Sequence, residues 1–315
     1  MQEKHWTTDD IPDLSGKVII VTGANSGIGY EAAKAFAHYS AQTILACRSE
    51  EEGPAAALKI RSTHPDAHVD CMHLDLTSLA SVSQFAEAFK DEYNRLDVLV
   101  NNAGIMMVPY ARTEDDFELH FGTNHLGHFA LTGLLLEQLL TTPGARVVTI
   151  SSTMHRIGRM DFENLMYDGG NGYTPSSAYG RSKLANLLFT YALQRRFEAV
   201  RSKAIAVAAH PGGTNTNLQD EIYEHWYIRV FKPFMQIYMQ DAHMGALPTM
   251  RAAVDPDVKG GQYYGPGGWM EQRGYPVLVE SSAASHNLED ANRLWQISEE
   301  LTGVSYEKIF SKFTR

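Results

Sequence analysis

Two side chains that could move a proton stand four residues apart in the stretch "SAYGRSKLAN", residues 177–186. Tyr179 can donate a proton as a general acid or accept one as the phenolate, and Lys183 carries a positive charge. An ordinary tyrosine pKa of about 10 makes the phenolate scarce at neutral pH. Residues four apart share one helical face, so we expect the Lys183 ammonium to lower the pKa of Tyr179. Because this spacing occurs in many helices, the surrounding elements must decide whether the pair does chemistry.

Strand-like and helix-like segments alternate along most of the chain. The expected strands are residues 17–23, 42–48, 68–76, 96–104, 145–152 and 203–213. The expected helices cover about 28–39, 51–64, 78–93, 114–141, a segment that carries Tyr179, and 288–304. Strands that are almost continuously apolar are typical of a parallel sheet covered on both faces. We therefore predict an α/β fold, a single-domain Rossmann-type doubly wound parallel sheet of about seven strands with helices on both faces.

We expect residues 1–315 to form one domain with a core at about 15–265, because no repeat or linker interrupts the pattern. Two long connections follow expected strands, at residues 153–176 and 214–245. The second is rich in aromatic residues and is predicted to be a lid over an apolar substrate pocket. Core helices, an oligomer contact or a membrane-surface patch are the alternatives. The tail from about 260 is expected to add a final strand and, over about 266–315, a C-terminal cap.

The composition excludes several classes of function. The chain of 315 residues has 27 basic and 37 acidic residues and a formal net charge of −10, which disfavours nucleic-acid binding. Its two cysteines, Cys47 and Cys71, lack a metal-like or redox spacing, which favours a reducing compartment. The N-terminal residues are polar, and no run of 18 apolar residues occurs, so we expect no signal peptide and no membrane span. A cytoplasmic location is the expectation.

The segment "TGANSGIG", residues 22–29, stands between the first expected strand and helix. Its glycines let the backbone turn tightly and approach a ligand, while the N–H groups and dipole of the helix N-terminus favour a pyrophosphate. A glycine-rich turn without a ligand is the alternative. The expected phosphate-binding residues are Gly23, Asn25, Ser26, Gly27, Ile28 and Gly29.

The end of the second expected strand bears on the choice of dinucleotide. An acidic residue there would bond the ribose hydroxyls of NAD, whereas this strand ends in Arg48 and Ser49. A guanidinium suits a 2′-phosphate, so we expect NADP(H) rather than NAD(H). The alternative is a solvated Arg48 paired with one of the glutamates at 50–52. Asp75 and Leu76, which close the third strand, are expected near the adenine.

Six motifs in order resemble the short-chain dehydrogenase/reductase family over about residues 15–265. They are "TGANSGIG" (22–29), "NNAG" (101–104), "NHLGHF" (124–129), "SS" (151–152), "YGRSK" (179–183) and "HPGGTNT" (210–216). The chain is most similar to the retinol-dehydrogenase-like branch, with which it shares "ACR" after the second strand and "YGRSKLANLLF". It departs from membrane-anchored members in lacking an N-terminal apolar segment, so the resemblance implies no retinoid substrate in a bilayer.

The resemblance implies a catalytic tetrad of Asn124, Ser152, Tyr179 and Lys183. Tyr179 would be the general acid/base, Lys183 its tuner and a ribose ligand, and Ser152 a donor to the carbonyl oxygen, with Ser151 as its competitor. Asn124 would kink its helix and place a water behind the lysine. The remaining cofactor contacts, besides Tyr179 and Lys183, would be Asn102, Ala103, Gly104, Pro211, Gly212, Thr214 and Thr216.

Three histidines, His120, His125 and His128, invite a zinc interpretation. We expect ordinary buried or surface histidines instead, because no cysteine or suitably placed carboxylate accompanies them in a zinc pattern.

The residues together predict an NADP(H)-dependent oxidoreductase acting on a small hydrophobic aldehyde, ketone or secondary alcohol, with a homodimer as one conceivable assembly. A non-catalytic NADP(H)-sensing protein on the same fold is the alternative, disfavoured because Ser152, Tyr179 and Lys183 are all present. A second alternative is an enzyme similar to protochlorophyllide reductase. It is disfavoured because Cys47 and Cys71 fall in early strands, away from the substrate side.

Overall fold

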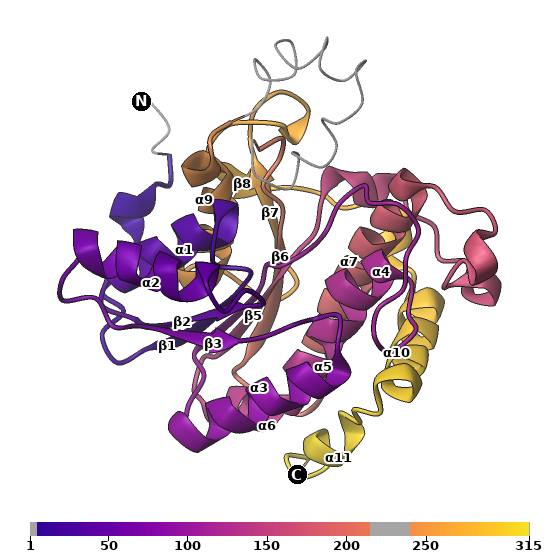
Figure 1. The fold of residues 1–315 in the computed structure, drawn as a ribbon, viewed down its shortest axis with the longest axis horizontal. Coiled ribbons are helices and arrows are strands. Elements are labelled where there is room, and N and C mark those ends of the chain that lie inside the picture. Colours follow the sequence, from indigo (N-terminus) through magenta and orange to yellow (C-terminus); the bar gives the residue numbers. More distant parts are fainter. Residues whose placement is uncertain (1–4, 215–239, 315) are drawn as a thin grey trace.

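The computed structural model describes residues 5–214 and 240–314, and a single mixed sheet forms the centre of this part of the chain (Figure 1). Its eight strands follow the order β3-β2-β1-β4-β5-β6-β7-β8, and β8 alone runs antiparallel to its neighbour. The strands are β1 (Val18–Thr22), β2 (Gln42–Cys47), β3 (Val69–His73), β4 (Val98–Asn101), β5 (Arg146–Ile150), β6 (Ile205–Ala209), β7 (Tyr263–Pro266) and β8 (Pro276–Leu278). The doubly wound α/β prediction is confirmed, and the sheet has one strand more than the seven expected.

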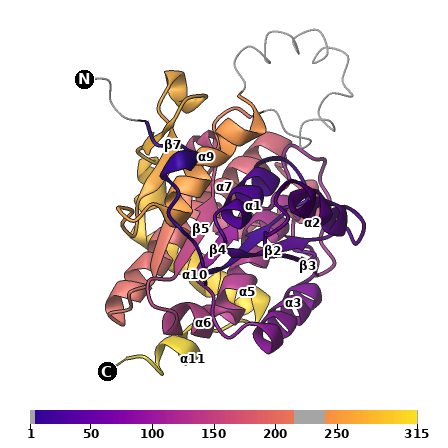
Figure 2. The same ribbon diagram turned by 90° about the vertical axis from the view of Figure 1, so that its left-hand side faces the viewer.

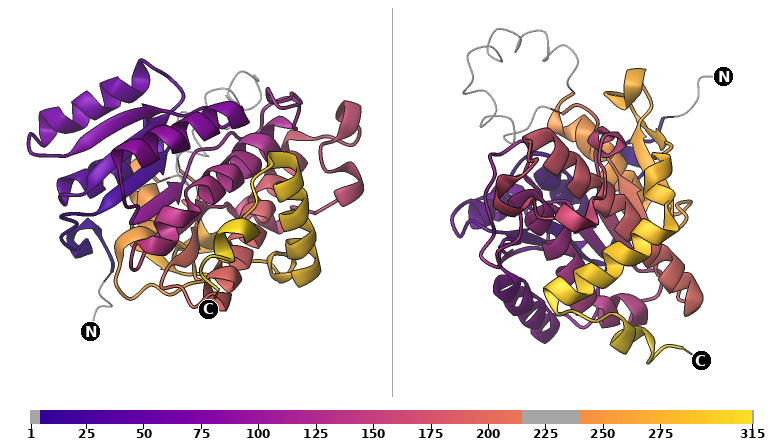
Figure 3. Two further views of the ribbon diagram at one scale, coloured as in Figure 1. Left: turned by 90° about the horizontal axis from the view of Figure 1, so that it is seen from below. Right: turned by 90° about the vertical axis from the view of Figure 1, so that its right-hand side faces the viewer.

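Helices cover both faces of the sheet (Figures 1 and 2). One face carries α1 (Gly27–His38), α2 (Glu52–Thr63) and α9 (Ala242–Val254). The other carries α3 (Leu79–Glu92), α4 (Leu119–Phe121), α5 (Gly127–Leu134), α6 (Leu136–Thr141) and α7 (Pro175–Ala199). Two further helices, α10 (Leu288–Thr302) and α11 (Glu307–Phe310), follow the sheet in the chain, and α10 packs on α5 and α7 (Figure 3).

The central strands are apolar because both of their faces are buried. Every residue of β1 and β4 is buried, and separate clusters of apolar side chains fill the space above and below the sheet. Such strands suit a parallel sheet, in which crossover helices cover both sides. The arrangement leaves the carboxyl ends of β1, β4, β5 and β6 together at one edge, where open α/β sheets bind ligands.

The helix expected over 114–141 begins later and is interrupted. Glu118 is extended (ψ 135°) and caps α4 by accepting hydrogen bonds from the backbone N–H groups of His120 and Phe121. A π-helical turn at Gly122–Leu126 then separates α4 from α5, and the backbone breaks again at Leu135. An inserted π turn is rare and is often found at functional sites. Here it carries Asn124.

The helix α7 places Tyr179 and Lys183. It starts where Thr174 and Ser177 cap each other, with Pro175 in the first helical position, where its missing N–H costs nothing. The helix then runs for 25 residues between the sheet and α10, and most of its side chains are buried. Tyr179 and Lys183 therefore lie one turn apart near its first third, beside the end of β5.

The chain beyond β6 tests some of the remaining predictions about the fold. The final strand expected after residue 260 is confirmed as β7, and the unexpected β8 follows it. The proposed lid is largely residues 215–239, which lie outside the described residues, as does Thr216. The segment's ends meet in a bridge between Thr214 and Gln240. Within the described residues, no helix has the length and apolar character that crossing a bilayer would require.

Candidate active site

A cavity of about 450 Å³ opens at the carboxyl ends of the central strands. Gly23 follows β1, Gly104 follows β4, Ser152 follows β5 and Pro211 follows β6, and all four line this cavity. Tyr179 closes it from α7. Every proposed cofactor residue within the described part of the chain is among the lining residues. The structure thus brings residues from eight separate stretches of sequence to one place.

The turn between β1 and α1 has the shape of a phosphate cradle. Gly23 adopts a left-handed conformation (φ +64°), and a Cβ on Gly29 would lie 2.4 Å from the Gly23 carbonyl oxygen. Ser26 stands at the N-cap of α1 but gives no side-chain hydrogen bond to the first turn. Backbone N–H groups of a twelve-residue helix therefore point into the cavity without a capping side chain. This geometry fits the pyrophosphate of a dinucleotide.

The end of β2 forms the far wall of the cavity. Arg48 is exposed there, and among the described residues it has no ion pair, so the expected alternative of a partner at 50–52 is not seen. Glu52 instead accepts a hydrogen bond from the Asn25 amide at 2.7 Å, across the cavity wall. The Ser49 hydroxyl oxygen accepts the backbone N–H of Glu52 at 3.1 Å, at the start of α2.

Asp75 and Leu76 reach the same wall from the end of β3. The Asp75 carboxylate accepts both the backbone N–H and the hydroxyl of Thr77, each at 2.8 Å. These two bonds fix the direction of the carboxylate at the rim of the cavity. Leu76 is buried and packs under α5, where a Cβ on Gly127 would touch it.

The expected depression of the Tyr179 pKa is not seen. Burial raises the pKa of Tyr179 to about 12, and a side-chain hydrogen bond with Ser152 is the opposing effect. The Lys183 ammonium lies 5.6 Å from the centre of the Tyr179 ring and donates to the Ile150 carbonyl at 3.1 Å. Burial also lowers the pKa of Lys183 to about 8. The prediction from helical spacing was wrong because desolvation of the phenolate is the larger effect, and the effect that opposes it comes from Ser152 rather than from Lys183.

The two serines after β5 have different surroundings. The Ser151 hydroxyl donates to the backbone carbonyl of Lys183 at 2.9 Å and is buried. The Ser152 hydroxyl oxygen accepts the backbone N–H of Met154 at 3.2 Å, which leaves its proton to point elsewhere. Ser151 thus holds α7 against β5, while Ser152 can donate toward the cavity and Tyr179.

Asn124 lies beside the cavity and is fully buried. Its amide exchanges two hydrogen bonds with the Ile105 backbone, at 2.8 and 3.0 Å, and donates to the Ser182 hydroxyl at 2.9 Å. The hydroxyl of Ser182 in turn donates to the Tyr179 carbonyl. Asn124 therefore ties the loop after β4 to the helix that carries Tyr179. The kink expected at this residue is the π turn.

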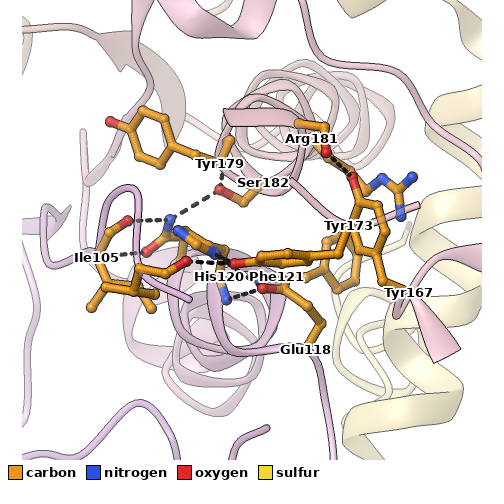
Figure 4. Close-up of polar contacts among 12 residues, drawn as sticks. Ile105, Glu118, His120, Phe121, Tyr167, Tyr173, Tyr179, Arg181 and Ser182 are labelled. Carbon is orange, nitrogen blue, oxygen red and sulfur yellow. Dashed lines mark hydrogen bonds and ion pairs between the residues drawn. The ribbon is translucent and has the colours of Figure 1, made fainter. Parts of the chain in front are cut away.

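The three histidines have structural partners. His128 bonds Thr22, His125 bonds Ser298, and His120 bonds the buried Glu118 at 3.0 Å. Within residues 5–214 and 240–314, no group of three potential ligands could hold a metal ion. His120 also lies with its ring edge-on to Tyr179, 6.2 Å between centres (Figure 4). It packs against the Tyr179 ring.

Several residues of the site were missed by the sequence prediction. Ile105 and Met106 line the cavity directly after the "NNAG" motif, and Thr77, Thr123 and Gly213 line it as neighbours of predicted residues. Their adjacency to recognised motifs was the available signal. Thr22 is also important, because its hydroxyl oxygen accepts the backbone N–H groups of Asn102 and Ala103, each at 2.9 Å.

Comparison with known proteins finds a family, relatives and solved structures to which this chain is similar. Residues 17–226 match the family model described as short chain dehydrogenase. Retinol dehydrogenase 12 of Mus musculus is 40% identical over 297 residues, which cover 93% of this chain and 89% of the relative. A crystal structure of an uncharacterized protein from Mycobacterium paratuberculosis has a TM-score of 0.79 at 40% identity and covers 96% of this chain and 99% of that one. A Shigella flexneri short chain dehydrogenase complexed with NADP has a TM-score of 0.61 at 25% identity, covering 80% and 97%.

The relative from Mus musculus and the Mycobacterium paratuberculosis structure match this chain over 93% and 96% of its length. The chain belongs to the short-chain dehydrogenase family and is an oxidoreductase acting on CH–OH and C=O groups.

Proposed function

We propose that the protein is an NADP(H)-dependent oxidoreductase that interconverts a hydrophobic aldehyde or ketone and its alcohol, with Tyr179 as general acid/base. The observation that carries this proposal is that Ser152, Tyr179 and Lys183 line the same cavity as the glycine turn of α1. A dinucleotide bound along that cavity would supply the hydride. The residues of the chain would bind it, orient the carbonyl and move the proton.

The protonation states of the site suit carbonyl reduction at neutral pH. A Tyr179 pKa of about 12 keeps the phenol protonated, so it can give its proton to the developing alkoxide. The Ser152 hydroxyl, with its oxygen already accepting from Met154, would donate to the same oxygen. Lys183 supplies positive charge next to Tyr179, and Asn124 holds the loop and the helix together.

The proposed preference for NADP(H) rests on Arg48. Its guanidinium lies at the cavity wall, exposed and without an ion pair among the described residues, where it could bind a 2′-phosphate. A related structure that contains NADP supports the proposal. The competing charge is Glu52, which stands in the same wall and is held by Asn25.

The proposed class of substrate is small and hydrophobic. Ile105 and Met106 present apolar surface beside the proposed reacting groups, and the relative with 40% identity is named a retinol dehydrogenase. An aliphatic or isoprenoid aldehyde is therefore the first substrate to test, and reaction direction is part of the same test. The cytoplasmic location, the homodimer, the lid and the C-terminal cap stay predictions of the sequence.

The deciding experiment mixes the protein with NADPH and a panel of aldehydes and ketones of increasing length. We expect turnover by the wild type and its loss in Tyr179→Phe, with the dissociation constant for NADPH within about threefold of wild type because the phenol hydroxyl makes no contact with the phosphate turn. NADPH binding without turnover by the wild type would instead favour the cofactor-sensing alternative. Loss of NADPH binding in Tyr179→Phe would make Tyr179 a structural residue.

A further inference from the structure

The residues directly after Ser152 form a tight turn that the proposed chemistry does not use. Thr153–Arg156 is a short 3-10 helix, and Ser152 is its N-cap. The Ser152 hydroxyl oxygen accepts the Met154 backbone N–H at 3.2 Å. The direction of the Ser152 hydroxyl therefore depends on this turn keeping its shape.

His155 holds the turn from within. Its side chain is 1% exposed, and its Nδ1 lies 2.6 Å from the Ser152 carbonyl oxygen. Its backbone N–H donates to the same oxygen at 3.0 Å. Two donors from one residue thus bind the Ser152 carbonyl, while Met154 binds the Ser152 hydroxyl.

The second nitrogen of the His155 ring fixes its tautomer. The backbone N–H of Ser282 donates to Nε2 at 3.0 Å, so Nε2 is the acceptor and Nδ1 carries the proton. Burial lowers the pKa of His155 to about 4, so the ring is neutral at the pH at which proteins of this kind are assayed. A neutral ring with one donor and one acceptor satisfies both partners.

The same turn is tied to the C-terminal part of the chain at a second point. The Arg156 guanidinium donates to the Glu271 carboxylate at 3.0 Å and to the Glu280 carbonyl at 2.8 Å. The segment from Glu271 to Ser282 therefore contacts the turn at two points. One is the ion pair of Arg156 with Glu271 at the surface, and the other is the hydrogen bond from Ser282 to His155 in the interior.

We propose that His155 is a positioning residue for Ser152, which it joins to Ser282 so that the serine hydroxyl faces the cavity beside Tyr179. The inference rests on the proposed function for the role of Ser152, whereas the geometry of the Ser152–His155–Ser282 chain stands by itself. It makes the C-terminal segment part of the support of the active site.

Three substitutions separate positioning from packing. His155→Asn keeps a donor near the place of Nδ1, His155→Gln keeps an acceptor near the place of Nε2, and His155→Phe keeps the ring without either. We expect kcat for carbonyl reduction to fall about 10- to 100-fold in His155→Phe and His155→Gln, because a misplaced group costs about 10²-fold. His155→Asn should retain more of the wild-type kcat than the other two variants and still fall short of the wild type, because the bond to Ser282 is lost. The dissociation constant for NADPH should stay unchanged in all three.

Equal losses of kcat in His155→Asn and His155→Gln would overturn the proposal, since a packing role does not distinguish them. A double variant adds a second criterion. In the Ser152→Ala background, His155→Phe should cause no further loss of kcat, because the hydroxyl that it positions is gone. Independent, multiplicative losses would also overturn the proposal.

A crystal structure of His155→Phe tests the proposal without relying on turnover. We expect the Ser152 hydroxyl to leave the Met154 N–H and the turn at 153–156 to shift. An unchanged position of the Ser152 hydroxyl would contradict the positioning role of His155, whether or not the wild type is active. If the wild type is inactive but Ser152 is displaced in His155→Phe, the proposed function is wrong and the positioning role of His155 is supported.

Discussion

Burial sets the charge of Tyr179 and Lys183, the two side chains that we propose take part in proton transfer. Tyr179 and Lys183 are both buried, and burial disfavours the charged form of each, so the pKa of the phenol rises to about 12 and that of the amine falls to about 8. The cavity thus holds a neutral acid at pH 7 and an ammonium close to its titration point. The phenol therefore stays protonated at neutral pH, so a proton is available on Tyr179 for the proposed reduction.

This charge state predicts different pH profiles for the two directions of reaction. Reduction needs the protonated phenol, so its kcat/KM should be nearly constant between pH 6 and 7.5. Oxidation needs the phenolate, so its kcat/KM should rise about tenfold per pH unit over the same range. Initial rates measured with NADPH and with NADP⁺ on one aldehyde–alcohol pair check this. A flat profile for oxidation would show that Tyr179 does not titrate in the reaction.

Cofactor choice is predicted to depend on Arg48. Arg48→Asp should weaken NADPH binding about 10- to 100-fold and leave NADH binding unchanged or tighter, because Arg48 lines the cavity and is proposed to bind the 2′-phosphate that NADH lacks. Isothermal titration of both cofactors measures the ratio.

Glu52→Gln is the matched control for Arg48→Asp, since Glu52 lies in the same wall and carries the opposite charge. It should tighten NADPH binding by a few-fold and leave NADH unaffected, and more so at low salt. An NADPH/NADH ratio that is unchanged in Arg48→Asp would remove Arg48 from the cofactor site.

At the scale of elements, the position of the site could be predicted but the path of some elements could not. Four of the six motifs lie at the carboxyl end of an expected strand, and parallel strands bring these ends to one edge, so the position of the cavity follows from the order of motifs. The start of the helix expected at 114 could not be read from periodicity, because Glu118 acts as a cap only when His120 and Phe121 donate to it. The π turn at Gly122–Leu126 likewise depends on tertiary bonds of Asn124.

The eighth strand shows a similar limit. Residues 276–278 are apolar but too few to distinguish from a loop, and they become a strand only by pairing with β7. The direction of the Tyr179 pKa shift could not be predicted from the sequence either. It depends on how completely the fold removes water from the ring, and helical spacing gives no information about that.

The turn between β1 and α1 leaves no room for a methyl group on Gly29. Alanine normally stabilises a helix relative to glycine, by about 0.5–1 kcal/mol. Gly29→Ala should do the opposite, since its Cβ would lie 2.4 Å from the Gly23 carbonyl and 2.5 Å from the Asn102 amide. We expect NADPH binding to weaken at least about tenfold and Tm to fall.

Gly144→Ala is the control for Gly29→Ala. Gly144 has φ +73° and open space around its Cβ position, so alanine there strains the backbone without touching the cavity. Its Tm should fall while its dissociation constant for NADPH stays at the wild-type value. Equal cofactor binding in the two variants would mean that the turn tolerates a side chain.

At the scale of the whole molecule, several histidines are buried in the neutral form. Burial lowers the pKa of His125 to about 3, and that of His128 and of His155 to about 4. In the unfolded chain a histidine titrates at about 6.5. Between these values the unfolded chain binds protons that the folded chain cannot, so the free energy of unfolding falls as the pH falls.

The stability of the fold should therefore be full above pH 6.5 and decline toward pH 5, before most carboxylates titrate. Each of the three histidines contributes about 2 kcal/mol to the loss at pH 5, at about 1.4 kcal/mol per pH unit. Urea unfolding at intervals of half a pH unit measures the slope. His125→Gln should make the slope between pH 6 and 5 shallower by about one proton, even if it destabilises the fold at every pH. A slope that is unaffected by His125→Gln would show that this ring is protonated inside the folded protein.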